Sequence, residues 1–222
     1  MSGDELDEAD EMELSGAAFV ERPAGPRLDA VDMIRRAREA YGPDGRPALP
    51  PQVNWPIFPF ETDGLRVRPV EDPVLPEPPR HGESVEDCST CKAPDDAYVW
   101  TDERWRVSMP SEPASIPLLT LHTRDHLDFH ELTDELGAEL GVLLVRGQRA
   151  LSSIPGVGRV HVYKWGDGGA HLHVILAARP HGMRQLWGMF LSVWMSILPP
   201  LPVDEWAAIR DHVGLQLSGG GS

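Results

Sequence analysis

The chain lacks several features that mark large classes of protein. It has only two cysteines among 222 residues, Cys88 and Cys91, which excludes a disulfide-rich scaffold. Positive charge is scarce, because 20 lysines and arginines face 35 aspartates and glutamates, and the formal net charge of -15 argues against a broad nucleic-acid surface. The one strongly apolar run, residues 186–198, is too short and too interrupted to span a membrane. With no secretory signal before the acidic start, these absences favour a cytoplasmic protein.

Charge and proline content predict a division of the chain into three parts. Residues 1–18 carry seven acidic side chains and no basic one, which is typical of a disordered, solvated tail. Residues 19–86 contain many of the 22 prolines and are expected to form a short helix followed by a proline-rich extended arm. Residues 87–222 are the predicted folded domain.

The expected arm has an unusual aromatic content. Apolar residues recur at helical spacing over 27–41, and Gly42 and Pro43 end that predicted helix. Trp55 and Phe58 follow, and leaving such rings in water would cost roughly one to two kcal/mol or more each. We therefore expect residues 53–70 to dock on the core.

From Cys88 onward, apolar spacing predicts short strands and longer helices. The predicted elements are a hairpin of strands 98–100 and 105–108, a strand over 118–122, a helix over 134–153 with Thr133 as its cap, strands over 160–164 and 170–177 joined by a glycine-rich turn, and a helix over 183–198 that Pro199 and Pro200 end. This order predicts an α+β fold, in which helices pack on an antiparallel sheet.

Two histidines stand two residues apart in the predicted strand over 170–177. His171 and His173 would point to the same face of that strand, while Leu172 would point to the other. One histidine there would be an ordinary core residue, but two on one face are better suited to metal binding or to nucleophilic or proton-transfer chemistry near neutral pH.

The two cysteines are spaced as a C-x-x-C pair. In a chain with no other cysteine, this spacing favours a metal-binding or a redox pair over a structural disulfide. No helix is predicted to begin at Cys88 and lower the pKa of its thiol, so the redox interpretation is disfavoured.

The order of these motifs resembles the histidine-triad (HIT-like) superfamily. The likeness covers residues 87–180 and is nearest to the galactose-1-phosphate uridylyltransferase branch. It rests on Cys88-Ser-Thr-Cys91, the hairpin from Val99 to Val107, Leu118-Leu-Thr-Leu-His-Thr-Arg-Asp-His126, Glu131-Leu-Thr-Asp-Glu135 and His171-Leu-His173. The resemblance implies a HIT-like domain, a homodimer, and a strand histidine that attacks a nucleotide α-phosphate. The covalent nucleotidyl-histidine is then resolved by water or by another phosphate.

The resemblance also implies a set of metal ligands. Matched to the transferase branch, Cys88, Cys91, His126 and His171 would hold a structural Zn²⁺, and His173 would be the nucleophile. Two thiolates and two imidazoles would complete a closed tetrahedral zinc site. In the alternative register, His171 is the nucleophile, His173 is the third triad member and Gly169 takes the first position, which leaves the zinc site one ligand short.

The chain departs from the family pattern in two places. In the preferred register, Ile175 stands where the family has His or Gln, and no clear counterpart of the ribose-binding acid lies near 108–110. The histidines that could compensate are His122, His161 and His181.

Two functions remain open at this point. The first is a nucleotidyl hydrolase or transferase that acts on a nucleotide or sugar nucleotide. Its candidate phosphate-binding residues are the charged Arg124, Lys164 and Arg179 and the backbone N–H groups of Gly168 and Gly169. The second is a degenerate, zinc-stabilised HIT-like domain that serves as a binding or scaffold module without turnover.

Overall fold

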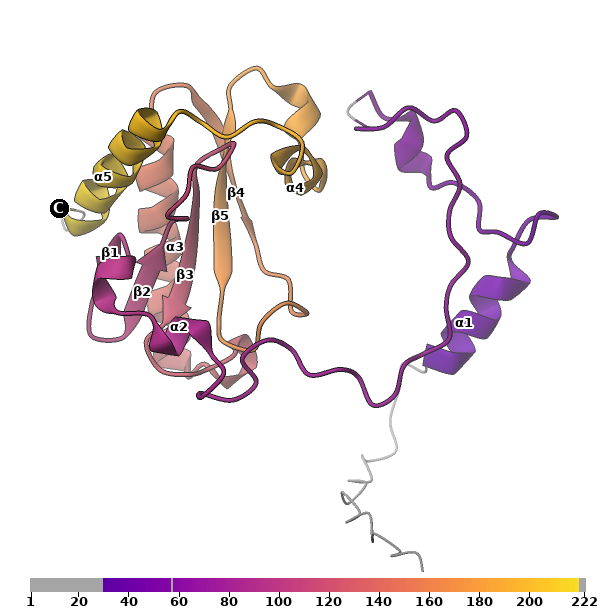
Figure 1. Ribbon diagram of the computed structural model, residues 1–222, viewed down its shortest axis with the longest axis horizontal. Coiled ribbons are helices and arrows are strands. Elements are labelled where there is room, and N and C mark those ends of the chain that lie inside the picture. The colour runs from indigo at the N-terminus through magenta and orange to yellow at the C-terminus, as the bar shows by residue number, and fades with distance from the viewer. Residues whose placement is uncertain (1–29, 57, 220–222) are drawn as a thin grey trace, which may run out of the picture.

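The computed structural model describes residues 30–56 and 58–219 (Figure 1). The predicted acidic tail, residues 1–18, lies outside the described residues. No helix in the described part of the chain is both long and apolar enough to cross a membrane.

A five-stranded antiparallel sheet forms the centre of the fold, in the order β1-β2-β3-β5-β4. Its strands are β1 (Trp100–Thr101), β2 (Trp105–Ser108), β3 (Leu118–Thr123), β4 (Val157–Tyr163) and β5 (Val174–Pro180). The predicted hairpin is present, since β1 and β2 pair with Trp100 opposite Val107. Helices pack against this sheet, and the predicted α+β class is therefore confirmed.

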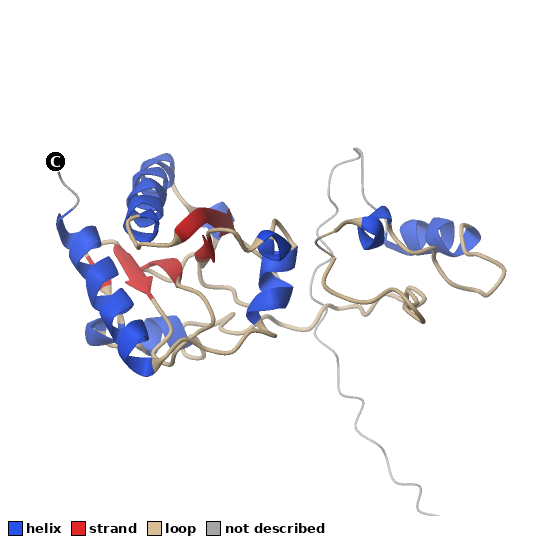
Figure 2. Cartoon of the chain, turned by 90° about the horizontal axis from the view of Figure 1, so that it is seen from above, coloured by secondary structure: helices blue, strands red, loops and turns tan. Residues whose placement is uncertain are grey.

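The long helix α3 (Asp134–Ser152) covers one face of the sheet (Figures 1 and 2). It begins where predicted, because the Thr133 hydroxyl accepts a hydrogen bond from the Leu136 N–H. Side chains along β3 alternate between partly and fully buried, which brings Leu119 and Leu121 to this face. A Cβ atom on Gly147 would lie 3.2 Å from the Leu176 side chain, so glycine lets the helix approach closely.

The helix α5 (Val203–Gly219) completes this core. Its buried residues Trp206, Val213 and Leu217 belong to the same apolar cluster as the α3 leucines. No helix is predicted for this segment from the sequence. Its hydrophobic and charged residues do not separate into two clear faces, so periodicity gives little signal.

The opposite face of the sheet is covered by a shorter helical segment. The predicted continuous helix over 183–198 is wrong, because the chain forms a 3-10 turn over Arg184–Leu186 and then α4 (Phe190–Met195). Gly188 separates the two pieces with φ of +55°, a left-handed conformation that a continuous helix does not contain. Leu186 and Leu191 pack on Ala177 of β5.

The N-terminal arm contains α1 (Ala30–Glu39) and a 3-10 turn over Pro51–Asn54. Docking of residues 53–70 on the core was predicted, and it is confirmed only for Trp55 and Phe58. The rings of Trp55 and Phe58 meet that of Phe190 edge-on, with centroids 6.1 and 5.7 Å away. Trp55 is nevertheless 45% exposed, so this contact is a partial one.

The segment that carries the two predicted histidines differs from expectation. A strand over 170–177 was predicted, but β5 begins only at Val174. The backbone N–H of Ala170 donates to the His81 carbonyl at 3.0 Å, and that of Leu172 donates to the Leu127 carbonyl at 2.7 Å. Residues 170–173 are therefore held by two loops in place of a neighbouring strand, which periodicity along the chain cannot reveal.

Candidate functional site

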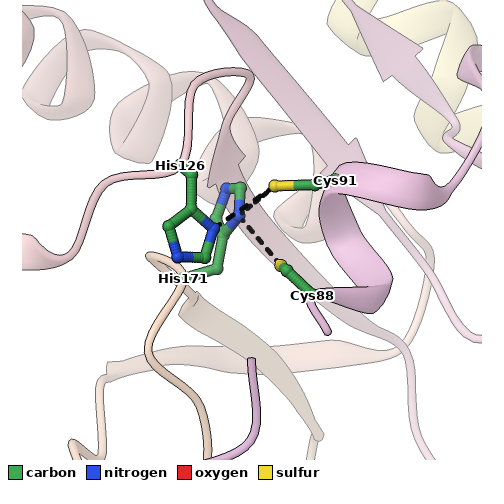
Figure 3. Close-up of side chains that lie close together, drawn as sticks. All are labelled: Cys88, Cys91, His126 and His171. Carbon is green, nitrogen blue, oxygen red and sulfur yellow. Dashed lines mark hydrogen bonds between the residues drawn. The ribbon is translucent and has the colours of Figure 1, made fainter. Parts of the chain in front are cut away.

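Four predicted metal ligands come together from three separate parts of the chain (Figure 3). The short helix α2 (Ser89–Lys92) has Cys88 as its N-cap and contains Cys91. His126 follows β3, and His171 precedes β5. The four ligand atoms all lie within 4.8 Å of one another. Cys88 and His171 are 2% and 5% exposed, so the cluster is largely closed to solvent.

The geometry of this cluster matches a tetrahedral zinc site. Nδ1 of His171 lies 3.3 Å from the Cys88 sulfur and 3.4 Å from the Cys91 sulfur, and Nδ1 of His126 lies 3.3 Å from the Cys91 sulfur. A zinc ion with ordinary bond lengths holds sulfur and nitrogen ligands about 3.5 Å apart. The observed spacing therefore fits the ion.

A second contact fixes the ring of His171 in the form that a metal needs. Its Nε2–H donates to the Thr123 carbonyl at 2.8 Å. A carbonyl can only accept, so the proton of the neutral ring sits on Nε2 and the lone pair of Nδ1 faces the two sulfurs. Burial lowers the pKa of His171, which also favours the neutral ring.

The helix α2 is held on the sheet by a buried arginine. Arg106 donates from Nη1 to the Thr90 carbonyl at 3.0 Å and from Nη2 to Asp95 at 2.9 Å, and its guanidinium lies over the Tyr98 ring. Sequence reasoning missed this support. The burial of Arg106 could have been inferred from the strand around Trp105 and Val107. Its partner Asp95, eleven residues earlier, could not.

The expectation that no helix begins at Cys88 was wrong, since α2 begins at Ser89. The helix is only four residues long, however, and it does not produce a reactive thiol at Cys91. Burial and the neighbouring Cys88 raise the pKa of the Cys91 thiol to about 11. The environment of Cys91 is thus unlike that of a reactive redox thiol, whose pKa is lowered.

His173 lies in a different environment from His171. Its Nδ1 lies 2.9 Å from the His171 carbonyl, and its Nε2 lies 2.8 Å from the Trp165 carbonyl. A Cβ atom on Gly169 would lie 3.8 Å from the imidazole ring, so the glycine-rich turn passes directly beside it. The ring is partly exposed and contacts neither cysteine in the described structure.

A charged cluster lies next to this turn. Asp128 accepts a hydrogen bond from Arg80 at 2.6 Å and faces the Lys164 ammonium at 3.4 Å, and Arg80 also donates to the Gly166 carbonyl at 3.2 Å. Burial by itself raises the pKa of Asp128, but the bonds from Arg80 and from the Phe129 N–H outweigh it and lower the pKa to about 2. Arg80 also donates to Glu83 at 3.0 Å, so two cations meet two carboxylates beside the turn.

A third histidine, His122, lies on β3 and contacts the segment that carries His173. On His122, Nδ1–H donates to the Leu172 carbonyl at 3.0 Å, so Nε2 must accept the bond of 3.0 Å from the Ser108 hydroxyl. Burial lowers the pKa of His122 to about 4, and the ring is neutral at ordinary pH. This compensating candidate therefore lies close to the predicted nucleophile.

The remaining predicted residues are dispersed. Arg124 binds Asp95 through both ends of its guanidinium and also donates to the Asp102 carbonyl. Arg179 lies at the far end of β5, six residues from His173 and so about 20 Å away along an extended strand. His161 lies on β4, opposite Ala177 on β5, and His181 follows β5. Of the phosphate-binding candidates, Gly169 lies beside the His173 ring. The Lys164 ammonium lies 4.0 Å from the position of a Cβ atom on Gly166 in the same turn, and a Cβ atom on Gly168 would have no neighbour within 4 Å.

A cavity of about 560 Å³ lies elsewhere, between the β1–β2 hairpin and α3. Its lining includes Trp100, Arg104 and Glu139 but none of the predicted site residues. The chemistry of the histidine region is therefore not associated with this cavity.

Comparisons with known proteins give similarity to solved structures alone. No family model matches the chain, and no curated protein matches it. A histidine triad protein from Bradyrhizobium japonicum is 22% identical over 54% of this chain and 89% of its own, with a TM-score of 0.43. A Zn-bound histidine triad family protein from Mycobacterium smegmatis is 15% identical over 62% of this chain and 100% of its own, with a TM-score of 0.45.

A uridylyltransferase structure is also similar, at 15% identity over 59% of this chain and 44% of its own, with a TM-score of 0.41. These proteins carry the names of the superfamily and the branch that the motif order resembles. At these identities and TM-scores, the similarity does not extend to activity or ligands.

Proposed function

We propose that the chain is a HIT-like nucleotidyl hydrolase or transferase, in which His173 is the nucleophile and Cys88, Cys91, His126 and His171 hold a structural zinc ion. The substrate is a nucleotide or sugar nucleotide. The observation that carries this proposal is the separation of roles between the two histidines, because the His171 lone pair faces the thiols while His173 has no contact with them.

The ring of His173 is oriented for attack through Nε2. In the structure both ring nitrogens face carbonyl oxygens, so Nε2 is not free to attack. Once the Trp165 carbonyl is displaced, the Nδ1–H that donates to the His171 carbonyl leaves Nε2 with the nucleophilic lone pair. In the proposed reaction, Nε2 forms a bond to the α-phosphorus while the bond from phosphorus to the leaving phosphate oxygen breaks. Water or another phosphate then attacks the same phosphorus, the N–P bond breaks, and the free histidine returns.

The glycine-rich turn must move before that attack. In the structure, Nε2 of His173 is 2.8 Å from the Trp165 carbonyl, at the place where the substrate phosphorus would have to approach. We expect substrate to displace residues 165–169, so that Gly168 and Gly169 can present backbone N–H groups to the phosphate. Lys164 and Arg80 lie beside this turn and would supply positive charge.

A zinc ion held by the four ligands would supply fixed geometry and no reactive position, because two thiolates and two imidazoles fill its coordination. The chain's contribution is to anchor His171 and, through the adjacent backbone, the His173 ring. We further propose that the protein acts in the cytoplasm, where the reduced Cys88 and Cys91 persist as metal ligands, and that it is a homodimer.

A second candidate is the degenerate domain without turnover. Two observations favour it: Ile175 occupies the third triad position, and Trp165 covers the nucleophilic nitrogen. Such a protein would retain the zinc ion and the fold and would serve as a binding module.

The test is a search for a covalent adduct. The purified full chain is mixed with a panel of nucleoside di- and triphosphates and sugar nucleotides, quenched in base and analysed by intact and peptide mass spectrometry. We expect one added nucleoside monophosphate per chain, on the peptide that contains His173. An adduct on His171 would support the alternative register, and no adduct or turnover with any compound would favour the binding module.

A further inference from the structure

Two arginines are buried to the same degree among the described residues, but only one has a counter-charge. Arg106 and Arg179 are each 8% exposed. Arg106 pairs with Asp95, whereas Arg179 makes no ion pair in the described part of the chain. A guanidinium cannot lose its proton in a protein, and burial of a charge without a partner costs free energy. Within the described residues, Arg179 therefore has no anionic partner.

The contacts of Arg179 leave one edge of its guanidinium unused. Nη1 donates to the Pro180 carbonyl at 3.0 Å and to the Met183 carbonyl at 3.2 Å. Nε is sealed from solvent without a hydrogen-bond partner, and Nη2 makes no hydrogen bond within the described residues. The edge formed by Nε and Nη2 is the fork that binds carboxylate and phosphate through two parallel bonds.

The neighbours of this edge are basic. Arg159 on β4 is directly opposite Arg179 on β5, and like charges in such a pair destabilise a sheet. His161 lies two residues further along the same face, and its Nε2 is also buried without a partner. Burial and the charge of Arg179 together lower the pKa of His161, which agrees with a local excess of positive charge.

The segment that flanks Arg159 and Arg179 supplies almost no negative charge. Residues 155–203 contain a single acidic residue, Asp167, and it belongs to the turn near His173. Gly158 packs closely beside this edge, because a Cβ atom there would lie 3.4 Å from Nη2 of Arg179. The same glycine is required by the backbone, since that Cβ would lie only 2.8 Å from the His181 Cα.

We propose that Arg159 and Arg179, with His161 beside them, form a binding site for a small oxyanion, the phosphate group of a ligand, at the outer edge of β4. The site is distinct from the proposed nucleophile. Along the extended strand, Arg179 is about 20 Å from His173. An anion here would form an ion pair with the buried guanidinium of Arg179 and would reduce the repulsion between Arg179 and Arg159.

The test measures thermal unfolding of the full chain with inorganic phosphate, against chloride at matched ionic strength. At a phosphate concentration about 100 times its Kd, we expect Tm to rise on the order of 5 °C. Arg179→Met should abolish this rise. Because that variant also loses two hydrogen bonds and can be less stable, Arg159→Gln provides a second test on an exposed side chain, and it should weaken the phosphate response as well.

Two controls make the outcome specific. Arg146 also donates to a backbone carbonyl, that of Leu217, and has no carboxylate partner in the described structure, so Arg146→Met should keep the full response. His173→Ala should keep it too, which separates this site from the proposed active site. The proposal would be overturned if phosphate did not raise the Tm of the unmodified chain. It would also be overturned if Arg179→Met and Arg159→Gln showed the same rise in Tm as the unmodified chain, or if His173→Ala lost that rise.

Discussion

His171 and His173 are two residues apart in one extended segment, yet their surroundings share almost nothing. His171 is 5% exposed, and its ring is fixed between two sulfurs and the Thr123 carbonyl. His173 is partly exposed, and its two ring nitrogens face the backbone carbonyls of His171 and Trp165. Neither environment is set by the adjacent residues in the sequence. The difference comes from α2, from the end of β3 and from the glycine-rich turn.

Two identical side chains thus acquire different chemical properties from the atoms that distant segments place around them. A nitrogen that faces thiols is suited to share a metal ion, and a nitrogen that faces a displaceable turn is suited to react. Substitutions that affect one histidine but not the other are therefore the most informative.

The largest effect is expected from loss of the metal cluster. His171→Ala or Cys88→Ser should remove zinc and destabilise the protein by several kcal/mol, because the proposed ion would join three distant segments. Elemental analysis and chemical unfolding would measure both changes. Retention of one zinc per chain by Cys88→Ser would show that the assignment of ligands is wrong.

The next effect should appear in activity alone. His173→Ala removes the proposed nucleophile, and we expect turnover to fall by at least about a thousandfold. Zinc content and Tm should remain close to those of the unmodified chain, since the ring contacts no predicted ligand side chain. Loss of zinc in this variant, with activity kept in His171→Ala, would reverse the two roles.

A smaller effect is expected at the charged cluster beside the turn. The pKa of Asp128 is about 2 in the folded protein, below its ordinary value of 3.8, so the charged carboxylate stabilises the fold. That contribution is present above about pH 4 and is lost as the pH falls from 4 to 2. Asp128→Asn should cost about 2 kcal/mol at pH 7.

The control for this variant is its own pH dependence. The difference in unfolding free energy between Asp128→Asn and the unmodified chain should shrink as the pH falls from 4 toward 2. A difference that stays constant over this range would show that the charge of Asp128 does not contribute to stability.

The smallest effect is expected from loss of the hydrogen bond between Ser108 and His122. Ser108→Ala removes the donor to Nε2 of His122 and should cost about 1 kcal/mol, since one hydrogen bond is lost. Zinc content should not change. A loss of zinc comparable to that of Cys88→Ser would show that His122 helps to position the metal ligands, which the geometry does not predict.

The four side chains that gather in the cluster could be named beforehand because the order of the sequence motifs resembles the HIT-like superfamily, and that resemblance implies this ligand set. Only two cysteines are available, and each of the two chosen histidines follows a recognisable motif. The sheet and α3 were also predictable, since alternation in β3 and leucine spacing in α3 reflect burial directly.

Other features depend on contacts that the sequence does not display. The break at Gly188 needs a left-handed residue that helical spacing does not indicate, and β5 starts late because loops take the hydrogen bonds of Ala170 and Leu172. The dispersal of Arg124 and Arg179 follows from pairing across the fold, which no local pattern specifies.

Gly82 has a consequence for how the chain can be shortened. Its φ is +69°, and a Cβ atom there would lie 3.2 Å from the Cα of Cys88. The preceding residue, His81, accepts the backbone hydrogen bond of Ala170. Residues 80–82 therefore contact both Cys88, at the start of α2, and the segment 170–173 that carries the histidines. A protease cut within or just after these residues would leave both ligand-bearing segments without a shared support, although it would remove none of the four ligands.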